Sequence, residues 1–128
     1  MALTTIVVML ALLEYIAFSF AVGSARGTYG VEAPATSGHP EFDKRYRVQM
    51  NTLEQLVVFL PAVFAFAHFV GDVWAAGLGA VWVVGRALYA RQYVADPASR
   101  GPGMMLTFIP SVVLVLGAVV GAGLSLLG

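Results

Sequence analysis

The sequence predicts an all-α integral membrane protein, folded as one four-helix bundle over residues 1–128. Of its 128 residues, 59% are hydrophobic and only 11% are charged, whereas a soluble domain carries about 25% charged residues. The mean hydropathy is +0.84. A spanning helix needs about 20 mainly apolar residues, and four segments meet that requirement, at residues 3–25, 40–70, 73–95 and 103–127.

The first span, residues 3–25, resembles a signal peptide only superficially. It lacks a basic N-terminal region, its apolar run of about 20 residues exceeds the 7–15 of a signal sequence, and Glu14 lies in its middle. We therefore expect a retained span. The loop that follows, residues 27–40, is predicted from its three glycines and two prolines.

The second and third spans form a predicted antiparallel hairpin. The apolar part of span 40–70 begins near Leu53, and Gly71 and Asp72 provide a tight turn into span 73–95. A second loop, residues 96–103, leads into span 103–127. Pro61 and Pro110 lie inside spans and are expected to kink them. Neighbouring helices can satisfy the freed carbonyl groups, so prolines are tolerated there.

The basic residues predict the orientation of the bundle. All seven lie in or near the two loops, and none lies in the Gly71–Asp72 turn or at a terminus; they are Arg26, Lys44, Arg45, Arg47, Arg86, Arg91 and Arg100. By the positive-inside rule, both loops face the cytoplasm and both termini lie on the opposite side.

Composition also excludes several functions. The net charge is zero and no basic patch is interleaved with aromatic residues, so we expect no nucleic-acid partner. The chain has no cysteine, which excludes a protein thiol as nucleophile, disulfide partner or metal ligand. His39 and His68 are too few and too far apart to indicate a metal site.

Polar residues of the second and third spans are predicted to meet in one layer. Arg47, Asn51 and Glu54 fall within roughly 60° of one another on a helix, and the residues Arg86, Tyr89 and Tyr93 share another face. Since the two spans are antiparallel, these groups lie at the same depth near the loops, together with Gln49 and Arg100. Three arginines against one glutamate indicate a site for an anionic, hydrogen-bonding ligand.

Simpler interpretations remain open at this point. Arg47 and Glu54 could form a pair that only neutralises itself and fixes helix packing. Tyr89 and Tyr93 could belong to an aromatic belt at the membrane boundary. Lys44, Arg45 and Arg91 are best explained as anchors that extend toward lipid headgroups. Glu14 could pair with a neighbouring helix or act as a coupling carboxylate.

Two motifs carry a family resemblance. The segment Pro40-Glu41-Phe42-Asp43-Lys44-Arg45-Tyr46-Arg47-Val48-Gln49-Met50-Asn51-Thr52-Leu53-Glu54 resembles the signature of the MAPEG superfamily, the membrane-associated proteins in eicosanoid and glutathione metabolism. Gly85-Arg86-Ala87-Leu88-Tyr89-Ala90-Arg91-Gln92-Tyr93 resembles its second motif, and Arg100 follows seven residues later. The four-span layout matches too, so the resemblance covers nearly the whole chain.

The resemblance implies roles for individual residues in binding glutathione. Arg47, Asn51, Glu54 and Tyr89 would hold its γ-glutamyl end, with Arg86 in the same layer. Arg26 and Gln49 would hold its glycyl carboxylate. Tyr93 would lie beside the cysteinyl part and Arg100 would face the sulfur. Gln55 and Gly27 depart from the pattern, standing where some members have a tyrosine and a second arginine.

The resemblance further implies a homotrimer with its site between neighbouring subunits, where Arg100 would come from the chain adjacent to the Arg47 face. Small residues in the last span (Gly117, Ala118, Gly121, Ala122 and Gly123) are compatible with close helix contact.

The expected function is that of a membrane-bound glutathione S-transferase of the detoxification type, with peroxidase activity as a possible addition. Glutathione would be the co-substrate, without a metal. The second substrate would be a lipophilic electrophile or lipid hydroperoxide taken from the membrane lipid. Two alternatives are a noncatalytic lipid-binding scaffold of the same family and a small proton-coupled multidrug transporter that uses Glu14.

Overall fold

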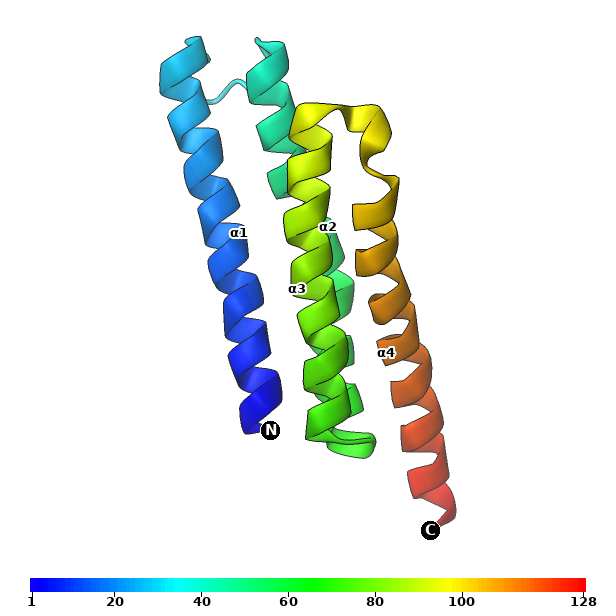
Figure 1. The fold of residues 1–128 in the computed structure, drawn as a ribbon. Helices are drawn as coiled ribbons and strands as arrows, with labels where there is room; N and C mark the ends of the chain where they lie inside the picture. Colours follow the sequence, from blue (N-terminus) through cyan, green and yellow to red (C-terminus); the bar gives the residue numbers. More distant parts are fainter.

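The computed structural model describes all 128 residues and contains four long helices. They are α1 (Ala2–Tyr29), α2 (Pro40–Phe69), α3 (Asp72–Ala95) and α4 (Gly101–Leu127), with a short 3-10 helix, η1 (Pro97–Ser99), before α4. The helices alternate in direction, so both termini lie at one end and the two longer connections at the other (Figure 1). Each helix is long and apolar enough to cross a membrane, which confirms the all-α, four-span prediction.

Two predicted boundaries needed correction. The loop was expected to start at Gly27, but α1 continues to Tyr29 and ends at Gly30, whose φ of 69° is left-handed. Glycine adopts that conformation without the steric cost that a side chain imposes, so Gly30 ends the helix. In the second loop, η1 occupies residues expected to be irregular, and α4 begins two residues early. Pro61 and Pro110 do not interrupt their helices.

Helices α2 and α3 form the centre of the bundle. Each contacts the other three helices, whereas α1 and α4 lie at opposite edges (Figure 1). Phe59 of α2 and Trp82 of α3 are completely buried and stack with ring centroids 4.3 Å apart. Val8 from α1 and Leu114 from α4 complete this core, so each helix contributes its inward face to one continuous cluster.

Glycines allow α4 to approach its neighbours closely. A Cβ atom added to Gly85 of α3 would lie 2.7 Å from the backbone of Leu106, and one added to Gly103 would overlap the backbone of Tyr89. Farther along α4, Gly117 packs against Phe66 and Gly121 against Phe69. These two small residues therefore serve contacts inside the chain, and they lend no support to an association between chains.

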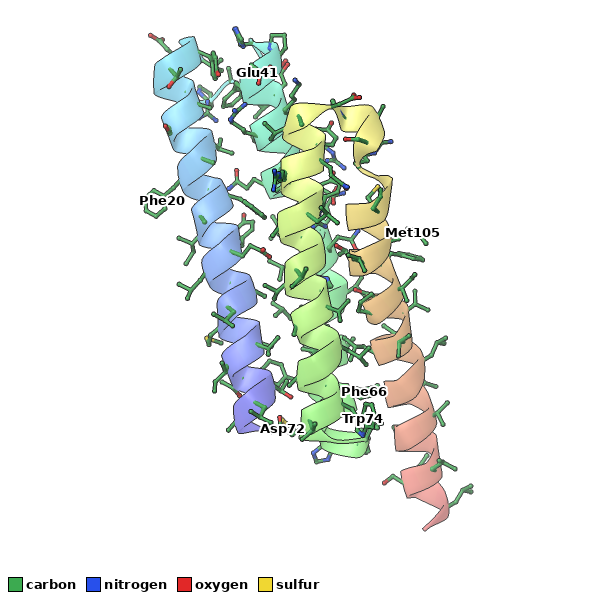
Figure 2. All side chains as sticks on the ribbon, in the orientation of Figure 1. Phe20, Glu41, Phe66, Asp72, Trp74 and Met105 are labelled. Atoms are coloured by element: carbon green, nitrogen blue, oxygen red, sulfur yellow. The ribbon has the colours of Figure 1, made fainter.

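The opposite end of the bundle is joined through Asp72. Its carboxylate accepts hydrogen bonds from the backbone N–H groups of Leu3 and Thr4, at 3.1 and 2.9 Å, and from the Thr4 hydroxyl at 2.6 Å. Asp72 thus caps the first turn of α1 from the start of α3 (Figure 2). This contact fixes the relative height of α1 and α3.

Large apolar side chains cover the outside of the bundle. Phe20 is 75% exposed and Met105 is 51% exposed, and both extend away from the helices (Figure 2). Exposed apolar area on this scale is unusual for a soluble monomer, whereas it suits a surface that contacts lipid.

Candidate functional site

The first feature of the site is an ion pair on the exposed face of α2. Arg47 Nη2 lies 3.0 Å from Glu54 Oε1, and the two side chains are 47% and 55% exposed. Their separation of two helical turns brings them onto one face, as predicted. An exposed ion pair contributes little to stability. Arg47 and Glu54 can therefore separate at little cost in free energy and each pair with an opposite charge on a ligand.

One turn of helix away, Asn51 receives a double hydrogen bond from α3. Arg86 Nη1 and Nη2 each donate to Asn51 Oδ1 at 2.9 Å. Arg86 is only 1% exposed, so it supports Asn51 from inside the bundle. The guanidinium carbon of Arg86 also lies 4.2 Å from the centroid of the Tyr89 ring, which is a favourable cation–π arrangement.

Tyr89 links this group to the start of α4. Its ring stacks on Tyr93 at a centroid distance of 5.7 Å. Gly103 packs on the backbone of Tyr89, and its N–H donates to Gln92 Oε1 at 3.0 Å. This contact holds the first turn of α4, and with it the exposed Arg100, beside the end of α3.

Contacts within one chain join part of the expected layer. Arg86 donates to Asn51 and lies over Tyr89, which stacks on Tyr93, while Arg47 and Glu54 pair with each other on α2. We expected Arg100 to come from an adjacent chain, and that expectation stays a prediction; within its own chain, Arg100 Nη1 donates to the carbonyl of Pro97 at 2.8 Å. Gln92, which sequence reasoning did not single out, holds α4 in place. In the sequence, only its position next to Tyr93 could have indicated that Gln92 lies near the site.

Gln49 and Arg26 lie apart from this layer, on the α1 side of α2. Gln49 Nε2 donates to the hydroxyl of Ser19 at 2.9 Å. Arg26 donates to the carbonyl of Ala35 at 2.6 Å and lies over the Phe42 ring. One chain thus presents two separate sets of candidate ligand-binding groups, one toward α4 and one toward α1.

Two cavities follow the groove between α2 and α4. The one nearest the polar layer has a volume of about 220 Å³, and its walls are Asn51, Gln55, Arg86, Met104, Met105, Thr107 and Phe108. The next, of about 270 Å³, shares Gln55 and Phe108 with the first, and its other walls are Val58, Ser111, Val112, Val115 and Leu116. The groove therefore runs from charged and amide groups into an apolar region, a combination typical of small-molecule sites.

A third cavity, of about 280 Å³, lies on the α1 side. Its walls are Phe18, Ala21, Arg45, Val48, Ala90, Arg91 and Val94. Arg45 also pairs with Glu41, 3.1 Å away, and Arg91 is exposed. The side chains around this space are mostly apolar, which agrees with the interpretation of Arg45 and Arg91 as anchors at the membrane boundary.

These features define a polytopic membrane protein with a polar site at one end and apolar space beside it. The chain matches the MAPEG family over residues 4–120. It is 46% identical over 109 residues to an uncharacterised protein of Synechocystis, a match that covers 85% of this chain and 80% of the relative. The chain belongs to the MAPEG family.

Two further relatives carry the names of enzymes. Human microsomal glutathione S-transferase 2 is 34% identical over 102 residues, covering 79% of this chain and 69% of the relative. Bovine leukotriene C4 synthase is 34% identical over 99 residues, covering 77% and 66%. The predicted family membership is thereby confirmed.

Proposed function

We propose that the protein is a membrane-bound glutathione transferase that activates glutathione as a thiolate and joins it to a lipophilic electrophile. The observation that carries the proposal is the groove between α2 and α4, which begins at Asn51 beside the charged layer and continues between apolar side chains. The names of the transferase and synthase relatives support glutathione as the co-substrate.

The charged layer matches the charges of the tripeptide. Arg47 and the amide of Asn51 suit the α-carboxylate of the γ-glutamyl group, and Glu54 suits its ammonium group. On binding, the Arg47–Glu54 pair is replaced by two charge-assisted contacts with the ligand, each worth roughly 1.5–3 kcal/mol. Arg26 and Gln49 are assigned to the glycyl carboxylate, so they must come from a second chain, because they lie on the other side of α2.

Activation of the thiol requires a positive charge near the sulfur. A free thiol ionises near pH 8.5, and the thiolate is the nucleophile. About 2–3 kcal/mol of stabilisation from a guanidinium lowers the pKa of the thiol by about two units. Arg100 is always protonated and stands at the loop edge, while the Tyr93 hydroxyl can donate a hydrogen bond to the same sulfur.

The reaction then needs no further cofactor. The sulfur lone pair forms a C–S bond with the electrophilic carbon, and the bond from that carbon to the leaving group breaks. The leaving group departs with the electron pair, and the thiol proton goes to solvent. With a hydroperoxide, the same thiolate would attack the terminal oxygen and the O–O bond would break. The alkoxide would take up a proton to become the alcohol, and a second glutathione would convert the glutathione sulfenic acid to the disulfide and water. The apolar part of the groove would hold either substrate next to the thiolate, which shortens the distance that must be crossed in the reaction.

The alternatives find less support. A proton-coupled transporter would need Glu14 on a path through the protein, but Glu14 lines none of the three cavities. A lipid-binding scaffold has no need for Arg100 and Tyr93 beside the ligand layer.

Turnover of the purified protein with glutathione and 1-chloro-2,4-dinitrobenzene tests the proposal directly. Formation of the thioether, seen as a rise in its absorbance, is the expected result. Glutathione binding without turnover of any aryl halide or hydroperoxide would favour the scaffold. Substrate-dependent proton flux in liposomes without turnover would favour the transporter.

A further inference from the structure

Three buried polar atoms of α1 and α3 have no hydrogen-bond partner within the chain. They are Glu14 Oε1, Trp82 Nε1 and Arg86 Nε, and all three are inaccessible to solvent. One of these atoms is an acceptor and two are donors. Buried polar atoms are normally paired, because leaving one unpaired costs about 1–3 kcal/mol.

The packing of α1 against α3 brings the three atoms to one level. Thr4 contacts Asp72, and Val7 contacts the backbone position of Gly79. Helices α1 and α3 run parallel (Figure 1). When the pairing in these two contacts is continued along both helices, Glu14 lies beside the turn of α3 that contains Trp82 and Arg86. The Glu14 and Arg86 side chains form no direct ion pair.

On its other side, Arg86 determines how Asn51 is turned. Both terminal nitrogens of Arg86 donate to Asn51 Oδ1. The opposite rotamer of the amide would place its NH₂ group against the cation, which is repulsive. The carbonyl oxygen is therefore held inside the bundle, and the Nδ2 donors remain for a ligand. A site built this way accepts a carboxylate and disfavours a group that can only donate.

We propose that Glu14 is a positioning residue of the glutathione site: through a water molecule shared with Trp82 Nε1 and Arg86 Nε, it holds the Arg86 guanidinium and so keeps the Nδ2 donors of Asn51 turned toward the ligand carboxylate. The water accepts one hydrogen bond from each donor and donates one to Glu14 Oε1, which gives it three partners, a typical number for a buried water.

This inference rests on the proposed function, and its test uses two ligands. The first is glutathione, and the second is 4-aminobutanoyl-cysteinyl-glycine, which is glutathione without the α-carboxylate. Calorimetric titration would be performed on wild type, Glu14→Leu, Glu14→Gln and, as a control on the exposed face of α1, Leu13→Ala. Glu14→Gln keeps an oxygen acceptor for the water, and it provides a second test should Glu14→Leu fail to fold.

The expected result is a selective loss. Glu14→Leu should weaken glutathione binding about tenfold, the effect of one lost charge-assisted bond, while binding of the decarboxylated analogue stays within about twofold of wild type. Glu14→Gln should retain most of the affinity, and Leu13→Ala should retain all of it. In an Asn51→Ala background Glu14→Leu should have no additional effect, because both changes remove the same contact.

Several outcomes would overturn the inference. Equal weakening of both ligands would assign Glu14 a merely structural role, and additive losses in the Asn51→Ala background would show that it acts by another route. If Arg47→Ala weakens glutathione binding and Glu14→Leu does not, the positioning role is wrong while the proposed function stands. Wild-type protein that binds neither ligand would remove the proposed function itself.

Discussion

At the scale of single residues, exposure separates two kinds of group in the polar layer. Arg47, Glu54 and Arg100 are exposed at its rim, whereas Arg86 and Tyr89 are buried behind Asn51. Exposed groups can bind a ligand at a small cost in free energy, because their interactions with their present partners are weak. Buried groups are held by neighbours and act by fixing the geometry of others. Substitutions at the rim should therefore change ligand affinity without changing the fold.

The first prediction concerns Arg47 and Glu54. Arg47→Ala or Glu54→Ala should lower glutathione affinity about ten- to a hundredfold, since each removes a charge-assisted contact worth roughly 1.5–3 kcal/mol. Lys44→Ala is the matched control. Lys44 lies on the same helix and its side chain pairs with Glu41, so the substitution removes a charge outside the proposed site. Calorimetric affinities of both variants equal to that of the control would place Arg47 and Glu54 outside the site.

The second prediction concerns Arg100. Arg100→Ala should lower kcat about tenfold at pH 7 with little change in the glutathione KM, because the charge stabilises the thiolate rather than the bound tripeptide. The ionisation of bound glutathione should move to higher pH, so the variant should recover activity as the pH rises toward about 8.5. Ultraviolet titration of the thiolate measures this directly. An unchanged ionisation would instead direct attention to the Tyr93 hydroxyl.

Helical spacing was sufficient to predict which residues share a face, but not how deep each one lies. The positions of Arg47, Asn51 and Glu54 follow from the period of the helix alone. The burial of Arg86 depends on the fit of α3 against α1 and α4, and the turned amide of Asn51 depends on Arg86. Neither pattern is visible in one sequence, because both arise from contacts between helices.

At the scale of helices, glycine contacts decide how closely α3 and α4 approach. Gly85 and Gly103 lie on this interface, directly beside Tyr89 and Arg86. Any added methyl group there must push the two helices apart, since the atoms it meets belong largely to the backbone. The spacing of the site thus depends on residues that take no part in its chemistry.

The third prediction compares two glycines of α3. Gly85→Ala would place a Cβ 2.7 Å from the backbone of Leu106, and overpacking of this kind costs about 1–3 kcal/mol. Gly77→Ala meets nothing within 4 Å, and it should stabilise the helix by up to about 1 kcal/mol. Thermal unfolding in detergent should therefore show a lower midpoint for Gly85→Ala and an equal or higher one for Gly77→Ala. A shared response would mean that α3 and α4 adjust freely.

The four helices were predictable because apolar length dominates the signal in a membrane protein. Their ends were less so. Gly27 and Gly30 are both glycines at the start of the predicted loop, yet only Gly30 adopts the left-handed conformation that ends α1. The helical turn η1 was likewise hidden in a segment rich in proline and glycine. Local capping geometry, rather than composition, sets these boundaries.

At the scale of the whole molecule, the two loops lie at one end and both termini at the other (Figure 1). The fourth prediction is that the loop end faces the cytoplasm, because every lysine and arginine lies toward it. The chain lacks cysteine, so single variants such as Ala35→Cys and Gly128→Cys can be labelled without background. An impermeant maleimide applied from outside should label the second and not the first. The reverse pattern would invert the topology.

The last prediction follows from the two separate faces of α2. Arg47 and Asn51 lie on the side of α2 toward α4, while Gln49 donates a hydrogen bond to Ser19 of α1. The residues on these two sides of one chain therefore cannot both contact a single tripeptide. If the site forms between chains, as the resemblance to a trimeric family implies, each site needs one face from each of two neighbours. Light scattering in detergent should then give a homotrimer.

Complementation between inactive variants tests this arrangement most sharply. An Arg47→Ala chain and a chain carrying both Arg26→Ala and Gln49→Ala should each be nearly inactive at low glutathione concentration. When the two are expressed together, mixed trimers contain some interfaces that unite the two unaltered faces, and these interfaces should restore a measurable fraction of wild-type turnover. Mixing the proteins after separate purification provides the control, since assembled trimers exchange no subunits unless they dissociate. If coexpression restores nothing although mixed trimers are isolated by two affinity tags, the two sets of residues do not meet across an interface. Glutathione would then have to bind within one chain, using the face toward α4 alone.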